Sequence, residues 1–297
     1  MTNAADSADP THPAGPAGPA PHPRAPGRTR RLLGLGADLP YQLLTLVVVA
    51  AVWEAYARTH DSILLPTFTE TAAATVKLLG EGELWRAAWI SNQALVLGFL
   101  AAVALGVPAG LLLGRFSTIE RYTDVYLSIL LVTPMAGIIP LLVMSVGFGL
   151  ASRVILVALF SVVMAVTSAR AGIRQIDPSL IEMSRTFGAS EAQIWRRVLI
   201  PGAMPAIMTG IRLALGRAVT GMVVVELLMV SVGYGGLILT YRSHFDAPAL
   251  YAVVVIVLSE AVLLISAARW IERRATPWIE HRTASSAPAH TSPRSTA

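Results

Sequence analysis

Residues 182–205 read EMSRTFGASEAQIWRRVLIPGAMP, a charged, amphipathic stretch between two long apolar segments. Capping signals lie just before this stretch and within it. Asp177 followed by Pro178 is typical of the start of a helix, because an acidic N-cap accepts backbone N–H groups and proline fits the first helical position. Gly188 is typical of a helix stop. We therefore expect a short helix over about 178–187.

A second short helix follows directly. Ser190 with Gln193 forms a capping box, and we expect Pro201 to end this helix and Pro205 to open the next apolar segment. The stretch therefore predicts a rigid helix–turn–helix. Capping alone leaves two interpretations open, a solvated connector and a docking element for a partner.

The composition indicates a membrane protein. The chain is 54% hydrophobic and 14% charged, whereas a soluble domain carries about 25% charged residues. Cysteine is absent, which excludes a disulfide framework and thiolate metal sites. The six histidines show neither metal-ligand spacing nor a nucleophile–base arrangement, so we predict no metal site and no catalytic residues.

The apolar runs predict an all-α membrane protein with about six transmembrane helices. Each run approaches or exceeds the ~20 residues needed to cross a bilayer. The predicted spans are about 40–57, 89–114, 125–147, 152–170, 205–230 and 249–268.

The remaining segments complete the domain organisation. Residues 1–37 and 276–297 are expected to be disordered tails, because the first is rich in Pro, Ala and Gly and neither shows hydrophobic periodicity. Residues 38–275 then form the transmembrane domain, with the loop at about 172–204.

The arginines indicate the orientation. The net charge of +5 comes from arginines in short loops between apolar runs, which favours a topology signal over a nucleic-acid surface. Most of them fall in segments that share one side of the membrane with both termini and with the 172–204 loop. We therefore predict a multi-pass protein of the plasma membrane with both termini and this loop in the cytoplasm, and no nucleic-acid partner.

The loop resembles that of a known family. Glu182 and Gly188, followed after nine residues by Val198, Ile200 and Pro201, resemble the EAA loop of ABC importer permeases. The pattern of that family is Glu-Ala-Ala, three residues, Gly, nine residues, Ile-x-Leu-Pro. The resemblance covers roughly residues 40–275, and Gly210–Ile238 is similar to the nitrate/sulfonate/taurine-type branch.

Three positions depart from the family pattern. Met183 and Ser184 replace the two alanines, and Ile200 replaces the leucine before the proline. Met183 is bulkier than alanine where a close fit is expected. The residues that the resemblance and the helical pattern assign to coupling are Glu182, Met183, Ser184, Gly188, Ile194, Trp195, Val198, Ile200 and Pro201.

The resemblance implies a fold and a mechanism. The fold would be that of a type I ABC importer permease. The loop would sit in a groove on a separate ATPase subunit that binds the ATP, so this chain would need no cofactor. Other implied partners are an extracytoplasmic solute-binding protein, a second permease copy in a homodimer, and the lipid bilayer. The solute stays open among nitrate, sulfonates, taurine and cyclic vitamin precursors.

Other function classes fit less well. A P-loop needs a lysine within G-x-x-x-x-G-K-[ST], and the single lysine, Lys77, lies in TVKLLG, so we predict a transport subunit that is not an enzyme. The alternative is a secondary transporter driven by an ion gradient, which would need ionisable coupling sites and usually internal repeats. A membrane-embedded enzyme is third.

Ionisable residues within the spans are the candidate pathway residues. They are Arg217, Glu226 and Glu260. An arginine near the centre of a spanning helix costs about 2.5–3.5 kcal/mol on insertion scales, so Arg217 needs a partner such as Glu260, or a watery cavity. Two hypotheses stay open for Arg217, an interhelical ion pair and an anion pathway. Glu226 lies half a turn out of phase with Arg217 and cannot pair with it on one face.

Two further segments have open interpretations. Thr133, Pro134, Gly137 and Pro140 in the third span predict either a kink beside the permeation path or a packing bend. The glycine-rich segment 231–248 is expected to dip back towards the path, to touch a delivery protein, or to form a flexible turn.

Overall fold

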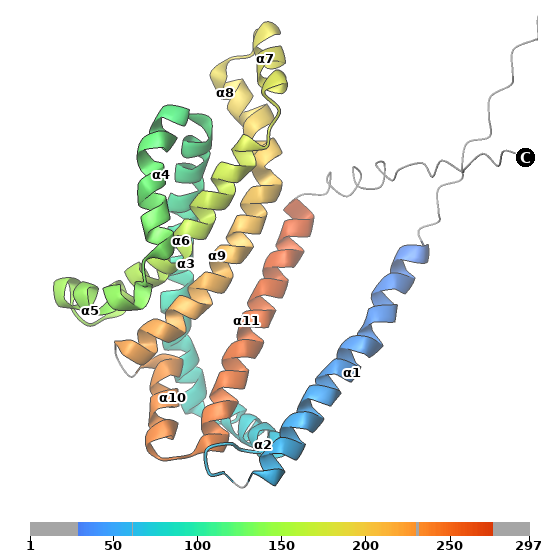
Figure 1. The fold of residues 1–297 in the computed structure, drawn as a ribbon, viewed down its shortest axis with the longest axis vertical. Coiled ribbons are helices and arrows are strands. Elements are labelled where there is room, and N and C mark those ends of the chain that lie inside the picture. The colour runs from blue at the N-terminus through green and yellow to red at the C-terminus, as the bar shows by residue number, and fades with distance from the viewer. Residues whose placement is uncertain (1–28, 61, 230–231, 276–297) are drawn as a thin grey trace, which may run out of the picture. The chain divides into compact units, whose positions relative to one another are not determined.

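The computed structural model describes residues 29–60, 62–229 and 232–275, and every regular element in these residues is helical (Figure 1). Most of both predicted tails, residues 1–28 and 276–297, lies outside the described residues. Residues 29–37, which we expected to be disordered, form the start of α1 (Thr29–Thr59) instead. The Pro- and Gly-rich composition of the preceding residues hid the helix-forming run from Arg30 to Leu33.

The chain divides into two compact units, residues 1–52 and 53–297. In the first unit α1 exposes its apolar side chains, with Leu44, Val47 and Val49 each more than half exposed. The predicted first span, about 40–57, lies in this helix. An apolar helix with such a surface is suited to contact with lipid or with another apolar element.

The second unit is built on four long helices. They are α3 (Gly82–Arg115), α6 (Leu150–Arg174), α9 (Ile200–Leu228) and α11 (Ala247–Ala275). Within the described residues these are the helices long and apolar enough to cross a membrane, with α9 counted from Glu191. Helix α3 packs along α6, and α6 packs along α9 (Figure 1).

Small residues allow α3 and α6 to approach closely. Gly98, Gly106, Gly110 and Gly114 recur at multiples of four on α3 and face α6. A Cβ atom at Gly98 would lie 2.7 Å from the Cβ of Val157, so no larger residue fits without separating the helices. In a bilayer, where apolar burial gives little drive between helices, such close contact supplies much of the packing energy.

The third predicted span is not a single helix. Helices α4 (Ser117–Val132) and α5 (Met135–Val146) meet at a bend of 98°. Pro134 disfavours the helical region for Thr133, whose backbone is extended with ψ of 126°. The span predicted at about 125–147 is therefore a pair of helices joined by a bend, and this bend fits both hypotheses for the prolines, a kink beside the path and a packing bend. Counting this pair as one crossing, the described residues hold up to five spans.

The predicted end of the second loop helix at Pro201 is also wrong. Helix α8 (Glu191–Ile194), a π-helical turn (Trp195–Leu199) and α9 follow one another without a break and span 38 residues. In the π turn the N–H of Ile200 donates to the carbonyl oxygen of Trp195, five residues back. Because this wider turn shifts the hydrogen-bond register where Pro201 lacks an N–H, the helix tolerates the proline. We call residues 191–228 the α8–α9 rod.

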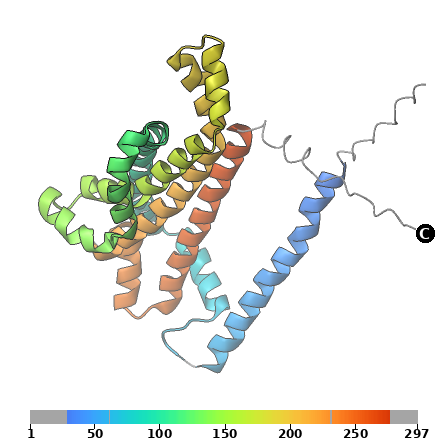
Figure 2. The ribbon, with the colours of Figure 1, turned by 45° about the horizontal axis from the view of Figure 1, so that its top comes forward.

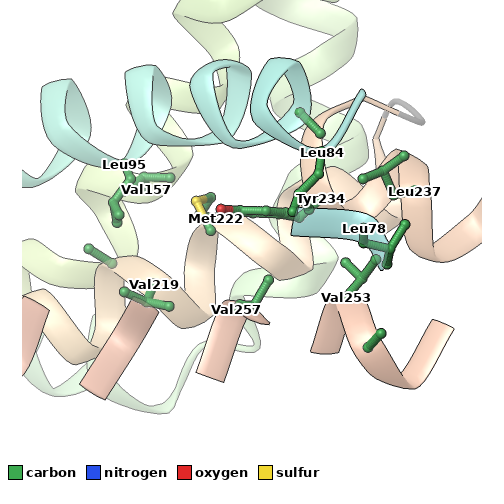
Figure 3. Packing of buried hydrophobic residues seen from close by; sticks show 13 residues of the cluster. Leu78, Leu84, Leu95, Val157, Val219, Met222, Tyr234, Leu237, Val253 and Val257 are labelled. Atoms are coloured by element: carbon green, nitrogen blue, oxygen red, sulfur yellow. The ribbon is translucent and has the colours of Figure 1, made fainter. Parts of the chain in front are cut away.

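The glycine-rich segment after the rod is helical. Helix α10 (Gly233–Ser243) replaces the flexible turn that we considered for residues 231–248. It packs against α3, α9 and α11, and α2 (Phe68–Leu79) packs against α11. Figure 3 shows Tyr234 among the apolar side chains of the cluster formed here, which include Leu84, Met222 and Val253.

Candidate functional site

The loop between α6 and α9 forms one end of the second unit. It contains α7 (Pro178–Thr186) and α8, and both project past the ends of α6 and α9 (Figures 1 and 2). Helix α10 lies at the other end of the rod (Figure 1). The loop and α10 are therefore separated by the length of the rod, ~57 Å at 1.5 Å per residue.

The start and end of α7 follow the local sequence signals. Asp177 accepts the N–H of Ser179 at 2.9 Å, with Pro178 at the first helical position. At the other end the N–H of Ala189 donates to the Ser184 carbonyl at 3.0 Å and that of Gly188 to the Arg185 carbonyl at 2.9 Å. This is a Schellman motif, and Gly188 has the positive φ of 76° that the motif requires.

The predicted capping box of α8 is present. The Ser190 hydroxyl accepts the N–H of Gln193 at 3.4 Å, and the Gln193 side chain accepts the N–H of Ser190 at 2.8 Å. The loop is therefore a helix–turn–helix closed by hydrogen bonds at both helix starts.

Apolar contacts fix the loop to the rest of the second unit. Ile194 is 1% exposed and Leu199 is fully buried, and both pack with Ala169 and Ile173 of α6. Ile194, which we assigned to the coupling surface, is thus buried against α6 and anchors the loop within this chain. Trp195, Val198, Ile200 and Pro201 are partly buried around it.

Ion pairs reinforce this attachment. Glu191 binds Arg185 at 2.6 Å and Arg115, the last residue of α3, at 3.4 Å. On the neighbouring helices Arg170 pairs with Glu120 and Asp124 of α4, each at 2.6 Å. Ion pairs therefore connect the loop to α3, and a separate group of ion pairs connects α4 to α6.

Two carboxylates of the loop are shifted towards the ionised form. The backbone N–H of Ser179 lowers the pKa of Asp177 below its usual range. The hydrogen bond from Arg185, with a smaller contribution from Arg115, lowers the pKa of Glu191. At neutral pH both groups are charged and stabilise the loop.

One exposed face of α7 is apolar. Leu180, Met183 and Phe187 are 45%, 51% and 83% exposed, and their spacing of three and four residues places them on one side of the helix. We call these three residues the α7 apolar face. An apolar stripe outside the core is the type of surface that a helix presents to a protein groove.

A groove of about 390 Å³ adjoins this face, between α7 and the rod. Predicted site residues that line it are Met183, Ser184, Gly188, Ile194 and Val198. Of the remaining predicted residues, Glu182 is exposed on α7. Phe187 and Leu180 were not among the predicted site residues, although their helical spacing with Met183 was readable from the sequence.

The candidate pathway residues separate into two places. Arg217 is exposed and lines a pocket of about 160 Å³ with Thr133 and Met135 on the two sides of the α4–α5 bend. Within the described residues it forms no ion pair. The suggested pair with Glu260 is not formed among the described residues, where Glu260 accepts the Tyr234 hydroxyl at 2.6 Å.

Glu226 lies at the opposite end of the rod from the loop and is 1% exposed. It accepts the Ser91 hydroxyl at 2.8 Å and the N–H of Gly235 at 3.1 Å, and Arg153 lies 3.8 Å away. Neither Glu226 nor Glu260 joins Arg217 in its pocket. Ser91 and Arg153 could not be found from sequence, because they are far from Glu226 along the chain.

Relatives of known family agree with this architecture. The sequence profile of the binding-protein-dependent transport system inner membrane component matches residues 102–277. A putative aliphatic sulfonates transport permease protein, SsuC, of Bacillus subtilis (strain 168) is 31% identical over 257 residues, which cover 86% of this chain and 91% of that protein. The taurine transport system permease protein TauC of Escherichia coli (strain K12) is 28% identical over 82% of this chain and 91% of its own length.

A solved structure shares the fold. A chain of the MetNI methionine ABC transporter, in an inward-facing conformation, superposes with a TM-score of 0.58 at 22% identity, covering 65% of this chain and 96% of that one. With the profile match over more than half of the sequence, the chain belongs to the binding-protein-dependent transport system inner membrane components, which are permeases of ABC importers.

Proposed function

We propose that this chain is the permease subunit that carries a small solute through the plasma membrane, driven by ATP that a separate subunit binds and hydrolyses. The observation that carries the proposal is the loop at 178–199, which is capped, anchored to the bundle and apolar on its outer face. A connector needs none of these features. A docking element needs all of them, because force can be transmitted only through a rigid attachment.

The α7 apolar face is the proposed contact with the ATPase subunit. Phe187 is the natural central anchor, because it is aromatic and 83% exposed. Arg185, Arg196 and Arg197 are exposed around the loop, so the matching surface should carry acidic groups.

The proposed assembly contains two copies of this permease, two ATPase subunits and an extracytoplasmic solute-binding protein. The arginine bias of the loops supports a cytoplasmic position for both termini and for the 178–199 loop. Helix α10 would then lie towards the extracytoplasmic side.

The proposed solute is a small sulfonate, taurine or nitrate, each of which carries negatively charged oxygens. Two relatives are described as sulfonate and taurine permeases. Arg217 supports the same class, since it brings to a pocket at the α4–α5 bend a positive charge that no described residue pairs. An arginine deep in a spanning helix requires a compensating group, and a passing anion supplies one.

Uptake into proteoliposomes tests this function. The permease is reconstituted with the ATPase and the solute-binding protein encoded by its neighbouring genes, and accumulation of radiolabelled taurine, an alkanesulfonate and nitrate is measured. We expect at least one of these solutes to accumulate, and we expect its accumulation to require internal ATP. Accumulation that follows a proton gradient without ATP would contradict the proposal and support a secondary transporter.

Arg217→Gln tests the pathway assignment. The variant removes the charge and keeps much of the side-chain length, so we expect a large loss of anion uptake with normal assembly with the ATPase. Unchanged uptake would show that Arg217 is not part of the path. Arg217→Lys, which keeps the charge, is the matched control.

A further inference from the structure

The end of the rod opposite the loop contains a buried polar cluster for which the proposed function gives no role. The carboxylate of Glu226 lies where α3, α6, α9 and α10 meet. One oxygen, Oε2, accepts the Ser91 hydroxyl of α3 at 2.8 Å and the N–H of Gly235 of α10 at 3.1 Å. The side chain is 1% exposed, so the carboxylate is almost completely removed from water.

The first turn of α10 is shaped to fit this carboxylate. A Cβ atom at Gly235 would lie 2.5 Å from the Cβ of Glu226, and one at Gly233 would lie 2.6 Å from its Oε1. Gly233 also has a positive φ of 62°, which suits glycine alone without strain. The two glycines therefore allow the α10 backbone to reach the carboxylate.

Tyr234, between the two glycines, adds two further contacts. Its N–H donates to the Ser91 hydroxyl at 2.9 Å, and its own hydroxyl donates to Glu260 of α11 at 2.6 Å. Polar contacts thus connect the first turn of α10 to α3, α9 and α11.

The charge of Glu226 is only partly compensated. Arg153 of α6 lies 3.8 Å from Oε1 and donates a hydrogen bond to the carbonyl oxygen of Ile90 instead. Oε1 has no hydrogen-bond partner among the described residues. A buried carboxylate that is fully hydrogen-bonded would be locked in place, whereas a partly satisfied one separates from its partners at lower cost.

The position of Glu226 on the rod gives this cluster a mechanical connection. The rod is one uninterrupted helix from Glu191, in the loop, to Leu228, two residues beyond Glu226. A displacement of the rod relative to α3 and α6 would therefore move the Glu226 carboxylate away from Ser91 and Arg153, which lie on those two helices.

We propose that Glu226, Ser91 and Arg153 form a latch that holds α10 against the bundle and opens when the rod moves. Glu226 and Arg153 are then positioning residues that act on α10 and not on the solute. The latch itself stands on geometry; only its opening during transport rests on the proposed ATP-driven function.

Cysteine labelling tests the latch directly, because the chain has no cysteine of its own. Leu237→Cys reports on α10, since Leu237 is 6% exposed in the cluster beneath that helix. Ala252→Cys in α11 is the matched control, since Ala252 is fully buried in the same cluster. Each single-cysteine protein is placed in nanodiscs, and its reaction rate with a membrane-impermeant maleimide is measured.

The latch predicts a selective effect. In the E226Q background the thiol of Leu237→Cys should react about tenfold faster or more, because a charge-assisted contact is lost, while that of Ala252→Cys stays protected. R153Q should act in the same direction, and R153K, which keeps the charge, should retain the slow rate. An unchanged rate for Leu237→Cys, or an equal rise for Ala252→Cys, would overturn the latch, the second because it indicates general loosening.

A second comparison uses the complex with the ATPase subunit. With the latch intact, ATP should raise the reaction rate of Leu237→Cys several-fold over the nucleotide-free sample. Equal rates in a sample that hydrolyses ATP would overturn opening during transport. Failure to bind or use ATP would count against the proposed function instead, and the E226Q comparison, which needs no ATPase, would still decide the latch.

Discussion

Gly188 and Gly233 lie at opposite ends of the second unit and share a left-handed backbone, with φ of 76° and 62°. Their surroundings differ completely. A Cβ atom at Gly188 would meet nothing within 4 Å, whereas one at Gly233 would meet the Ser91 hydroxyl and the Glu226 carboxylate. The loop end is therefore closed by its own backbone and leaves its surface free for a partner. The α10 end is closed by buried contacts from other helices.

This contrast predicts where substitutions destabilise the protein and where they affect only assembly. At the α10 end, lost packing should lower the free energy of unfolding. At the loop end, most exposed side chains should be dispensable for folding.

The largest effect is expected for Gly235→Ala. The added methyl group would lie 2.7 Å from the Glu226 carbonyl carbon, a backbone atom that cannot move aside alone. We expect a loss of about 3 kcal/mol in stability, seen as a lower Tm in detergent. Gly216→Ala is the control, because nothing lies within 4 Å of its Cβ position and alanine favours the helix. Equal Tm values for the two variants would contradict the importance of the close packing at Gly235.

Phe187→Ala should leave the stability of the permease unchanged and weaken its binding to the ATPase subunit. Because the side chain is 83% exposed, the Tm should not change. Affinity for the ATPase subunit should fall about 30-fold, since a central aromatic anchor contributes about 2 kcal/mol or more. Biolayer interferometry on the purified permease measures the change, and Thr186→Ala provides a neighbouring surface control. A lowered Tm with unchanged affinity would assign Phe187 to the fold instead.

Ser190→Ala should have a smaller, local effect. It removes the acceptor for the N–H of Gln193, which costs about 1 kcal/mol of helix stability. We expect faster amide exchange at residues 191–194 and no change in α10, because the cap acts only on the loop end. Ser190→Thr should keep the slow exchange. Faster exchange in α10 as well would show that the two ends are not independent.

The smallest effect concerns pH at the loop end. The pKa values of Asp177 and Glu191 are lowered in the folded loop, so both carboxylates stabilise it above their ordinary values of 3.8 and 4.5. This contribution is lost as the pH falls through the lowered values. A spin label on Phe187→Cys should have equal mobility at pH 7 and 5.5 and greater mobility below pH 3.8. Glu191→Gln should reduce this dependence, and equal mobility throughout would contradict the assignment.

The same contrast explains what could be predicted from sequence. At the loop end the caps at Asp177 and Ser190 and the turn at Gly188 depend on neighbours a few residues away, so their types and spacing predicted the geometry correctly. The α10 end depends on partners that are distant along the chain, such as Ser91 and Glu226, 135 residues apart. A contact between residues so far apart leaves no local pattern in the sequence, so it could not be predicted.

Backbone detail was hard to predict for a different reason. Pro134 and Pro201 give the same local signal, yet one accompanies a 98° bend and the other lies within a continuous rod. The π turn before Pro201 makes the difference, and nothing in the residue pattern distinguishes a π turn from an α turn. The spacing of Phe187 with Leu180 and Met183 was readable from the sequence, which already placed this loop outside the spans, but the exposed fraction of each side chain was not.

We propose above that the loop at 178–199 docks on a separate ATPase subunit. The most direct test is co-purification of the permease with the ATPase subunit encoded beside it, comparing wild type, Gly188→Asp and the control Gly216→Ala. We predict a stable complex for wild type and Gly216→Ala, and its loss for Gly188→Asp with the permease still folded. A complex that forms equally well with Gly188→Asp, or no complex with wild type, would contradict docking through this loop.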